Sequence, residues 1–302
     1  MLRMPAVDVH QHAWPRALVE QLRTRSTSPR LDGDVLHLDG EPPYDVDPAA
    51  HVVADRRARD ARDGIDLALL SLSSPLGIET LPPEDAAPLL EAWHDLVAEL
   101  GEGHGLWAAP GLVEPDLDLL RARLALPGVH GLQVPATSML DPAALERLAP
   151  VLAVAEDADR PVLVHPGPAA PASSAVPSWW PALTDYPAQL AAAWFAWHVA
   201  GRSLLPRLRI CFAALAGLAP LHHERLAARG GGLGAVDRRV FYETSSYGPR
   251  AVDAMVRVVG VDAIVHGSDL PYAEPRDPGL GEAFSHALHV TNPHHLLNGG
   301  TR

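Results

Sequence analysis

The sequence of 302 residues contains no lysine, and all of its 24 lysine-plus-arginine positions are arginine. Without a lysine amine, the protein cannot form a Schiff base with a carbonyl substrate or attach pyridoxal phosphate. A Walker-type phosphate loop is excluded for the same reason. A pair of metal ions bridged by a carboxylated lysine is excluded as well. These absences remove several common enzyme mechanisms before any motif is considered.

The sequence also has only one cysteine, no long apolar run and no net positive charge. Cys211 is the single cysteine, so no internal disulfide can form, and we expect a protein of the reducing cytoplasm. The apolar run at 190–200 is interrupted by His198 and is too short to cross a bilayer. A net charge of −13 argues against a nucleic-acid or anionic-membrane surface. We therefore expect the partner to be a small-molecule substrate.

Short apolar runs alternate with longer segments rich in Ala, Leu, Arg and Glu. Eight strands, most of them followed by such a helical segment, predict an α/β protein with a (β/α)₈ TIM barrel, which is common at this length. An open doubly wound sheet also alternates, but no glycine-rich dinucleotide fingerprint follows the first strand. The predicted strands are 6–10, 67–72, 106–111, 131–134, 161–165, 208–213, 240–243 and 263–266, and clear helical segments are 47–63, 83–100, 142–158 and 250–259.

Two insertions, after strands one and five, interrupt this alternation. The segment 24–48 contains Asp-Gly turns around a short apolar run, which predicts a hairpin lying over the barrel mouth. The segment 167–187 is rich in Pro, Ala and Ser and predicts a long loop over the same mouth, where it would help to build a pocket. Neither insertion resembles a linker, so we expect one domain over 1–302.

Metal-ligating residues stand where three of the predicted strands end. His10 and His12 are two apart at the end of the first strand, so both project to the same side. His165 ends the fifth strand and Asp269 follows the eighth, although packing alone would favour Val, Ile or Leu there. Three imidazoles and one carboxylate predict a catalytic site for one divalent ion, with Zn²⁺ first and Mn²⁺ or Fe²⁺ as alternatives.

In combination, these motifs resemble the amidohydrolase-2 (amidohydrolase-related) family, which includes α-amino-β-carboxymuconate-ε-semialdehyde decarboxylase. The resemblance covers nearly the whole chain and implies a barrel with one divalent metal held by the same three histidines and Asp269. Members include non-oxidative decarboxylases, C–C bond hydrolases, lactonases and hydratases. The motifs that carry the resemblance are His10-x-His12, Val164-His165-Pro166 and Gly267-Ser268-Asp269-Leu270-Pro271, with further likeness at 64–66, 241–246 and 291–293.

The sixth strand departs from the family pattern. The family usually has a histidine at its end, which acts as a base in the decarboxylases, whereas Ala214 stands here. An alanine cannot accept a proton, so another residue would have to do so. Glu243 at the end of strand seven is the best placed substitute, although it could equally support a metal ligand. The other candidates are His222, His223 and His198. For His222 and His223, we favour solvent exposure on a helix.

Four further residues are candidates for binding substrate. Trp14, Trp179 and Trp180 lie on predicted loops at the mouth and would form an apolar wall for an aromatic group. Arg225 has the spacing of an arginine with which the related decarboxylases reach the substrate carboxylate of a neighbouring subunit. This resemblance suggests a homodimer with shared sites, whereas a solvated arginine is the plain alternative.

Three functions are compatible with these residues. The first is a metal-dependent hydrolase of a small amide, lactone or activated C–C substrate, with Asp269 both as a ligand and as the proton acceptor. That hypothesis is the least affected by Ala214, because a base remains beside the nucleophile. The second is a non-oxidative decarboxylase of an aromatic or unsaturated carboxylic acid. The third is a catalytically degenerate barrel, of which Ala214 would be one mark.

Overall fold

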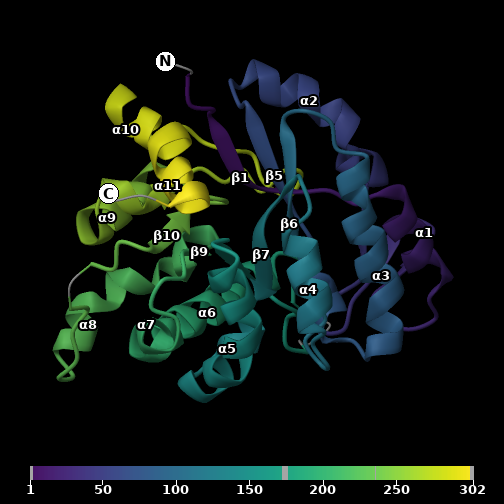
Figure 1. Ribbon diagram of the computed structural model, residues 1–302, viewed down its shortest axis with the longest axis horizontal. Coiled ribbons are helices and arrows are strands. Elements are labelled where there is room, and N and C mark those ends of the chain that lie inside the picture. The colour runs from purple at the N-terminus through teal and green to yellow at the C-terminus, as the bar shows by residue number, and fades with distance from the viewer. Residues whose placement is uncertain (1–2, 172–175, 235, 300–302) are drawn as a thin grey trace.

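The computed structural model describes residues 3–171, 176–234 and 236–299. Eight parallel strands form a barrel that is surrounded by helices, and the predicted TIM barrel is confirmed (Figure 1). Neighbours in the barrel follow the order of the chain. The strands are β1 (Val7–His12), β5 (Leu67–Ser71), β6 (His104–Ala108), β7 (Val129–Pro135), β8 (Val162–His165), β9 (Ile210–Phe212), β10 (Val240–Glu243) and β11 (Ile264–Val265).

Helices connect successive strands and cover the outside of the barrel. Several begin with the expected signals; for example, the Asp141 carboxylate accepts the Ala144 N–H, and Pro142 occupies the first turn. Within the described ranges, no helix is long and apolar enough to span a membrane. The helices are α1 (Arg16–Thr24), α2 (Val53–Arg62), α3 (Pro83–Asp95), α4 (Leu117–Leu124), α5 (Pro142–Asp157), α6 (Trp180–Ala196), α7 (Arg202–Leu204), α8 (His223–Ala227), α9 (Pro249–Val259), α10 (Glu282–His286) and α11 (Asn292–Asn298).

Alternation along each strand separates the barrel interior from the layer beneath the helices. In β8, Leu163 belongs to the interior cluster, while Val162 and Val164 pack in the outer layer. This period of two is what a strand buried on both faces requires. The interior cluster combines residues of seven strands with two leucines of α11: Val7, Val9, Leu69, Trp107, Leu163, Cys211, Phe241, Val265, Leu296 and Leu297.

The barrel closes between β1 and the chain that follows β11. Three backbone hydrogen bonds cross this seam: Val9 N–H to the His266 carbonyl at 2.9 Å, Asp269 N–H to the His10 carbonyl at 2.9 Å, and His12 N–H to the Leu270 carbonyl at 2.6 Å. Because β11 itself has only two residues, the polypeptide after it completes the ladder. The seam therefore joins the two chain segments that carry His10, His12 and Asp269.

The segment 24–48 forms a small antiparallel sheet, as its turns predict. Its strands are β2 (Arg30–Asp32), β3 (Val35–His37) and β4 (Tyr44–Asp45). Leu31 and Leu36 pack with Leu18 and Leu22 of α1 in a second core beside the barrel. The tip reaches the other insertion, because a Cβ on Gly40 would lie 2.3 Å from the Ala169 carbonyl oxygen.

The segment 167–187 is only partly a loop, which corrects the expectation from its composition. Residues 172–175 lie outside the described part of the chain, and α6 begins at Trp180. Proline suggested a loop, but Pro181 is tolerated because it occupies the first turn, where its missing N–H has no helical partner. The Tyr186 hydroxyl donates to Glu41 at 2.5 Å, so this segment and the 24–48 insertion are also joined by a hydrogen bond.

Replacing Gly131 with alanine tests how tightly the interior is packed. A Cβ at Gly131 would lie 2.3 Å from the Trp107 ring and 2.5 Å from the Pro161 carbonyl oxygen. We expect Gly131→Ala to lower the free energy of unfolding in urea by about 1–3 kcal/mol, since neither neighbour can move freely. In the control Gly111→Ala, the nearest atom lies at 3.7 Å, and we expect little change. Equal stability of Gly131→Ala and wild type would contradict this packing.

Candidate metal centre

His10, His12, His165 and Asp269 converge at the C-terminal mouth of the barrel, as the sequence predicts. Each residue offers one ligand atom, and these atoms all lie within 4.8 Å of one another. His10 Nε2 lies 3.0 Å from His12 Nε2, which is 3.2 Å from Asp269 Oδ1. The ring centroid of His165 lies 4.9 Å from that of His10 and 5.0 Å from that of His12. Side chains from the ends of β1 and β8 and from the segment after β11 therefore lie close together at one site.

These separations suit a single ion. Two donors that each lie about 2.1 Å from one metal, at about 90–110° to each other, are roughly 3.0–3.4 Å apart. The pairs His10–His12 and His12–Asp269 fall in this range. Three imidazole nitrogens and one carboxylate oxygen are also a donor set typical of Zn²⁺ and Mn²⁺ sites. The residues present thus fit one divalent cation.

A bulge in β1 lets two consecutive residues, Val9 and His10, both face the inside of the barrel. From Asp8 to Gln11, β1 advances three residues, while β5 advances two, from Ala68 to Leu70. The extra residue lets Val9 stay in the interior cluster although His10, the next residue, also faces the mouth. At the bulge, the Trp107 indole donates a hydrogen bond of 2.9 Å to the Val9 carbonyl.

The second nitrogen of each histidine has a neighbour that orients the ring. His12 Nδ1 lies 3.0 Å from the Ser71 carbonyl and His165 Nδ1 lies 2.9 Å from the Pro166 carbonyl, so both act as donors. His10 Nδ1 lies 3.3 Å from Glu243 Oε1. In His12 and His165, donation from Nδ1 leaves the Nε2 lone pair free for a metal and fixes the tautomer.

Glu243 lies behind His10 rather than at the centre of the cluster. Its buried carboxylate accepts the backbone N–H of Ala214 and of Ser245, and it also accepts the Ser245 hydroxyl. Gly267 makes room for it, because a Cβ there would lie 1.9 Å from Glu243 Oε2. Of the two roles open from the sequence, these contacts favour supporting the His10 ligand over accepting a proton from a substrate.

The electrostatics of the cluster favour a cation. Burial lowers the pKa of His10, but the charges of Glu243 and Asp269 outweigh burial and raise it overall. For His12 and His165, burial and the neighbouring histidines keep the pKa below its ordinary value, so these rings are neutral. Burial disfavours the Asp269 charge, but its close contact with His12 and the nearby His10 lower its pKa overall. A carboxylate beside neutral imidazoles is ready to bind a divalent ion.

At the end of strand six, Ala214 begins a left-handed turn. Residues from Ala214 to Leu218 all have positive φ, from 45° to 63°. This conformation costs about 1–2 kcal/mol for each residue that is not glycine. The Ala214 N–H bonds to Glu243, and Gly217 lies so close to α6 that a Cβ would be 2.2 Å from the Pro187 carbonyl oxygen. Contacts on both sides therefore hold the turn.

The histidines considered as substitutes for the missing base have other surroundings. His198 is exposed, lies 3.0 Å from the Gly232 carbonyl and stacks on Trp194. His222 is exposed, as we expected, whereas His223 is half-buried, which corrects the same expectation for it, and its Nδ1 lies 3.3 Å from the Pro220 carbonyl. None of the three belongs to the ligand cluster among the described residues.

An aromatic group that the sequence did not reveal borders the ligands. Tyr272 packs edge-on against His12 with centroids 5.1 Å apart, and 45% of its surface is exposed. Trp14 is buried beneath this surface, where it stacks on His51 at 4.5 Å and donates to Ser73. The Ser73 hydroxyl in turn lies 3.2 Å from the Tyr272 hydroxyl. Trp14 therefore supports the wall, whereas Tyr272 presents its ring to the mouth.

The other expected substrate-binding residues are exposed. Trp179 and Trp180, before and at the start of α6, are 56% and 39% exposed, and their rings lie 5.8 Å apart. Arg225 is exposed on α8. A role for Arg225 in substrate binding would therefore need a second copy of the chain, as the sequence analysis suggested.

A buried carboxyl near the ends of β5 and β7 also escaped sequence analysis. Glu79 is fully buried and accepts a hydrogen bond from Ser74, and Gln133 donates to the same Ser74 hydroxyl at 2.8 Å. Burial raises the pKa of Glu79 to about 7, which the Ser74 hydrogen bond only partly offsets. The signal in the sequence is a lone acidic residue among Leu76, Ile78 and Leu81.

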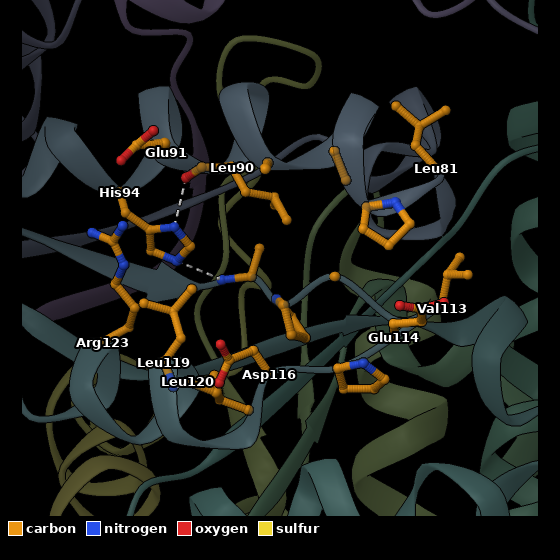
Figure 2. Close-up of a pocket in the computed structure, with 17 residues that line it drawn as sticks. Leu81, Leu90, Glu91, His94, Val113, Glu114, Asp116, Leu119, Leu120 and Arg123 are labelled. Carbon is orange, nitrogen blue, oxygen red and sulfur yellow. Dashed lines mark hydrogen bonds between the residues drawn. The ribbon is translucent and has the colours of Figure 1, made fainter.

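A hollow of about 250 Å³ lies outside the barrel, between α3, α4 and the loop after β6 (Figure 2). Its walls are mostly apolar, and none of the four ligand residues lines it. Figure 2 shows His94 bridging two backbone groups: Nδ1 lies 2.6 Å from the Leu90 carbonyl, and Nε2 accepts the Ala109 N–H at 3.3 Å. Burial, with Arg123 nearby, lowers the pKa of His94 to about 4, so it packs as a neutral ring.

The raised pKa of Glu79 predicts a pH-dependent stability. Between its ordinary value of 4.5 and about 7, native Glu79 keeps a proton that the unfolded chain has lost, so stability falls as the pH rises. Glu79→Gln removes this proton equilibrium. From pH 5 to pH 8, we expect wild type to lose about 2.5 kcal/mol of unfolding free energy relative to the variant. Parallel pH profiles of the two proteins in urea unfolding would refute this.

Comparison with known proteins supports the fold. Neither a protein-family model nor a curated protein sequence matches the chain. The apo structure of IDCase from Metarhizium anisopliae is 18% identical, with a TM-score of 0.79 and 97% of each chain covered. The 5-carboxyvanillate decarboxylase LigW from Sphingomonas paucimobilis is 17% identical, with a TM-score of 0.73, and 98% of this chain and 99% of that chain are covered.

A third similar structure contains a metal. It is a variant of the 5-carboxyvanillate decarboxylase from Novosphingobium aromaticivorans with bound manganese, 14% identical, with a TM-score of 0.72 and 97% of each chain covered. Likeness at this level of identity extends to the fold over nearly the whole chain. The chain is thus a TIM barrel of the same overall architecture as these structures, with four potential metal ligands at its mouth.

Proposed function

We propose that this protein is a metal-dependent, non-oxidative decarboxylase of the amidohydrolase-related family that acts on an aromatic or unsaturated carboxylic acid. The convergence of His10, His12, His165 and Asp269 at the barrel mouth carries the proposal, because it combines a cation site with an accessible face. Mn²⁺ and Zn²⁺ are the candidate ions, and the manganese in a structure of similar fold favours Mn²⁺. We expect a cytoplasmic enzyme.

The sequence alone favoured hydrolysis, and the similar structures shift this preference. Two of the three that we compare are named decarboxylases of an aromatic acid, and the likeness extends over nearly the full length of each chain. Hydrolysis of an amide, lactone or activated C–C bond remains the second candidate, because an ionised Asp269 beside the ligands would serve as its base. The more specific likeness to the subgroup around the muconate-semialdehyde decarboxylase stays a prediction, because none of the three compared structures is named as a member of it.

The residues at the mouth suit the proposed reaction. A bound divalent ion would supply positive charge that attracts a substrate carboxylate and stabilises developing negative charge. The exposed ring of Tyr272, edge-on to His12, favours a flat substrate beside the ligands. When the bond to the carboxylate breaks, its electron pair stays on carbon, which must gain a proton. Asp269, with 18% of its side chain exposed, would accept a proton from water and pass it to this carbon, while the carboxylate leaves as CO₂.

Metal analysis together with product analysis tests this function. We expect about one equivalent of Mn or Zn per chain in wild type, and a loss of at least tenfold in affinity for His165→Ala. A panel of hydroxylated benzoates, small amides and lactones is assayed in H₂¹⁸O, and we expect the benzoates to release CO₂ without incorporating ¹⁸O into the remaining product. Incorporation of ¹⁸O into the products of an amide or lactone, with no CO₂ from the benzoates, would favour the hydrolase. A wild type that binds metal but turns over nothing would favour the degenerate barrel, and one that takes up no metal would refute both enzyme hypotheses.

We also propose that Arg225 completes the site of a neighbouring copy in a homodimer. Arg225→Ala should then raise KM for a carboxylate substrate, because a charge partner is lost, and should leave metal content unchanged. Mixing Arg225→Ala with Asp269→Ala should restore part of the wild-type activity, since a mixed dimer has one complete site. A monomer in solution, or no recovery in the mixture, would contradict a shared site.

A further inference from the structure

A buried polar cluster lies against the seam that closes the barrel. It consists of Asp8 and Gln11 of β1, Arg56 and Asp60 of α2, and His104 of β6, all of them buried. Burying so many charged groups is costly and seldom increases stability over apolar packing. None of these residues is a member of the ligand cluster. Their hydrogen bonds indicate what the seam gains from them.

Asp8 joins the two sides of the seam through backbone N–H groups. Its Oδ1 accepts the His10 N–H from β1 at 3.1 Å and the Ser268 N–H from the chain after β11 at 3.1 Å. One donor belongs to a ligand residue, and the other belongs to the residue before the ligand Asp269. A shift of either segment along the seam would therefore break one of the two hydrogen bonds.

Arg56 joins the same two segments through their carbonyls. Its Nη1 donates to the carbonyl of His12 and, at 3.3 Å, to that of Leu270. Its Nη2 donates to the Ala50 carbonyl at 2.6 Å, which ties the guanidinium to the chain before α2. The planar fork of arginine is suited to reaching two acceptors at once. Arg56 thus binds the backbone of His12, a candidate ligand, and of Leu270, which directly follows the candidate ligand Asp269.

Gln11 and Asp60 hold these two groups in place. Gln11 Nε2 donates to Asp8 Oδ2 and to Asp60 Oδ1, both at 2.9 Å, and Gln11 Oε1 accepts from Arg56 at 3.4 Å. His104 Nε2 lies 3.0 Å from Asp60 Oδ2. The charges of Asp8 and Asp60 therefore lie close to that of Arg56, and the cluster is one connected network.

We infer that Arg56 is a positioning residue for the metal site, which sets the distance between Asp269 and the His10–His12 pair without touching the ion. The inference rests on the proposed metal-binding function. Only a short ladder joins β1 to the segment after β11, so few other bonds resist a shift along the seam. Partners that orient metal ligands typically contribute a factor of about 10–100 to metal affinity.

Arg209 provides a matched control at the opposite end of the barrel. It is buried to the same degree, at 5% exposure against 6% for Arg56. It too donates to several carbonyls, those of Leu296, Asp159 and Leu297, at 2.7, 2.6 and 3.3 Å. Arg209 directly precedes β9, whereas the ligands lie at the C-terminal ends of the strands. Replacing it removes a comparable buried clamp far from the ligands.

Metal affinity and folding stability, measured on Arg56→Met and Arg209→Met, test the inference. Each metal-free protein is titrated with Mn²⁺ or Zn²⁺ against a competing chelator, and its unfolding in urea is followed separately. We expect both variants to lose stability, but only Arg56→Met to bind metal about 10–100-fold more weakly than wild type. Arg56→Lys keeps the charge but has one donor nitrogen, which cannot replace both Nη1 at the seam carbonyls and Nη2 at the Ala50 carbonyl. Its metal affinity should therefore fall between those of wild type and Arg56→Met. This variant carries the test where Arg56→Met does not fold.

Three results would overturn the inference. Unchanged metal affinity in a folded Arg56→Met or Arg56→Lys variant would show that the clamp does not position the ligands. An equal loss in Arg209→Met would show that affinity follows general stability. A wild type that binds neither ion would instead refute the proposed metal site itself, and this result is distinct because it appears before any variant is compared.

Discussion

Four candidate metal ligands meet at the barrel mouth, and three of them lie on the two chain segments that close the barrel. His10 and His12 lie on β1, and Asp269 lies on the segment after β11, a strand of only two residues. Few backbone hydrogen bonds join these two segments. A ligand displaced by even an ångström leaves the coordination range of an ion. The contacts that close the barrel therefore also set the distances between these candidate ligands.

Buried polar groups meet this requirement from two directions. Inside the mouth, Glu243 fixes His10, and Gly267 leaves the space that the carboxylate needs. Outside the strands, Asp8 and Arg56 span the seam through backbone groups. Burying such polar groups costs free energy, so a gain in folding stability does not explain why they are there. Orientation of the metal ligands explains their presence better.

Ala214 at the end of strand six contributes to the architecture of the site through its backbone. Its N–H bonds to Glu243, and the strained turn that follows is held by α6. Under the proposed function, proton transfer would fall to Asp269, the one candidate ligand with an ionisable oxygen. The Tyr272 ring packs edge-on against His12 beside these groups, which is why we propose a flat carboxylic acid as the substrate.

The barrel and the four candidate ligands could be predicted from the sequence, because strand alternation and strand-end residues are local properties of the chain. It could not reveal the bulge that turns both His10 and Val9 inward, since a bulge exists only relative to β5. The burial of Glu79, the place of Trp14 beneath Tyr272 and the clamp made by Arg56 depend on segments far apart in the chain. Only tertiary packing, which sets burial and distance between such segments, decides the charge and role of these residues.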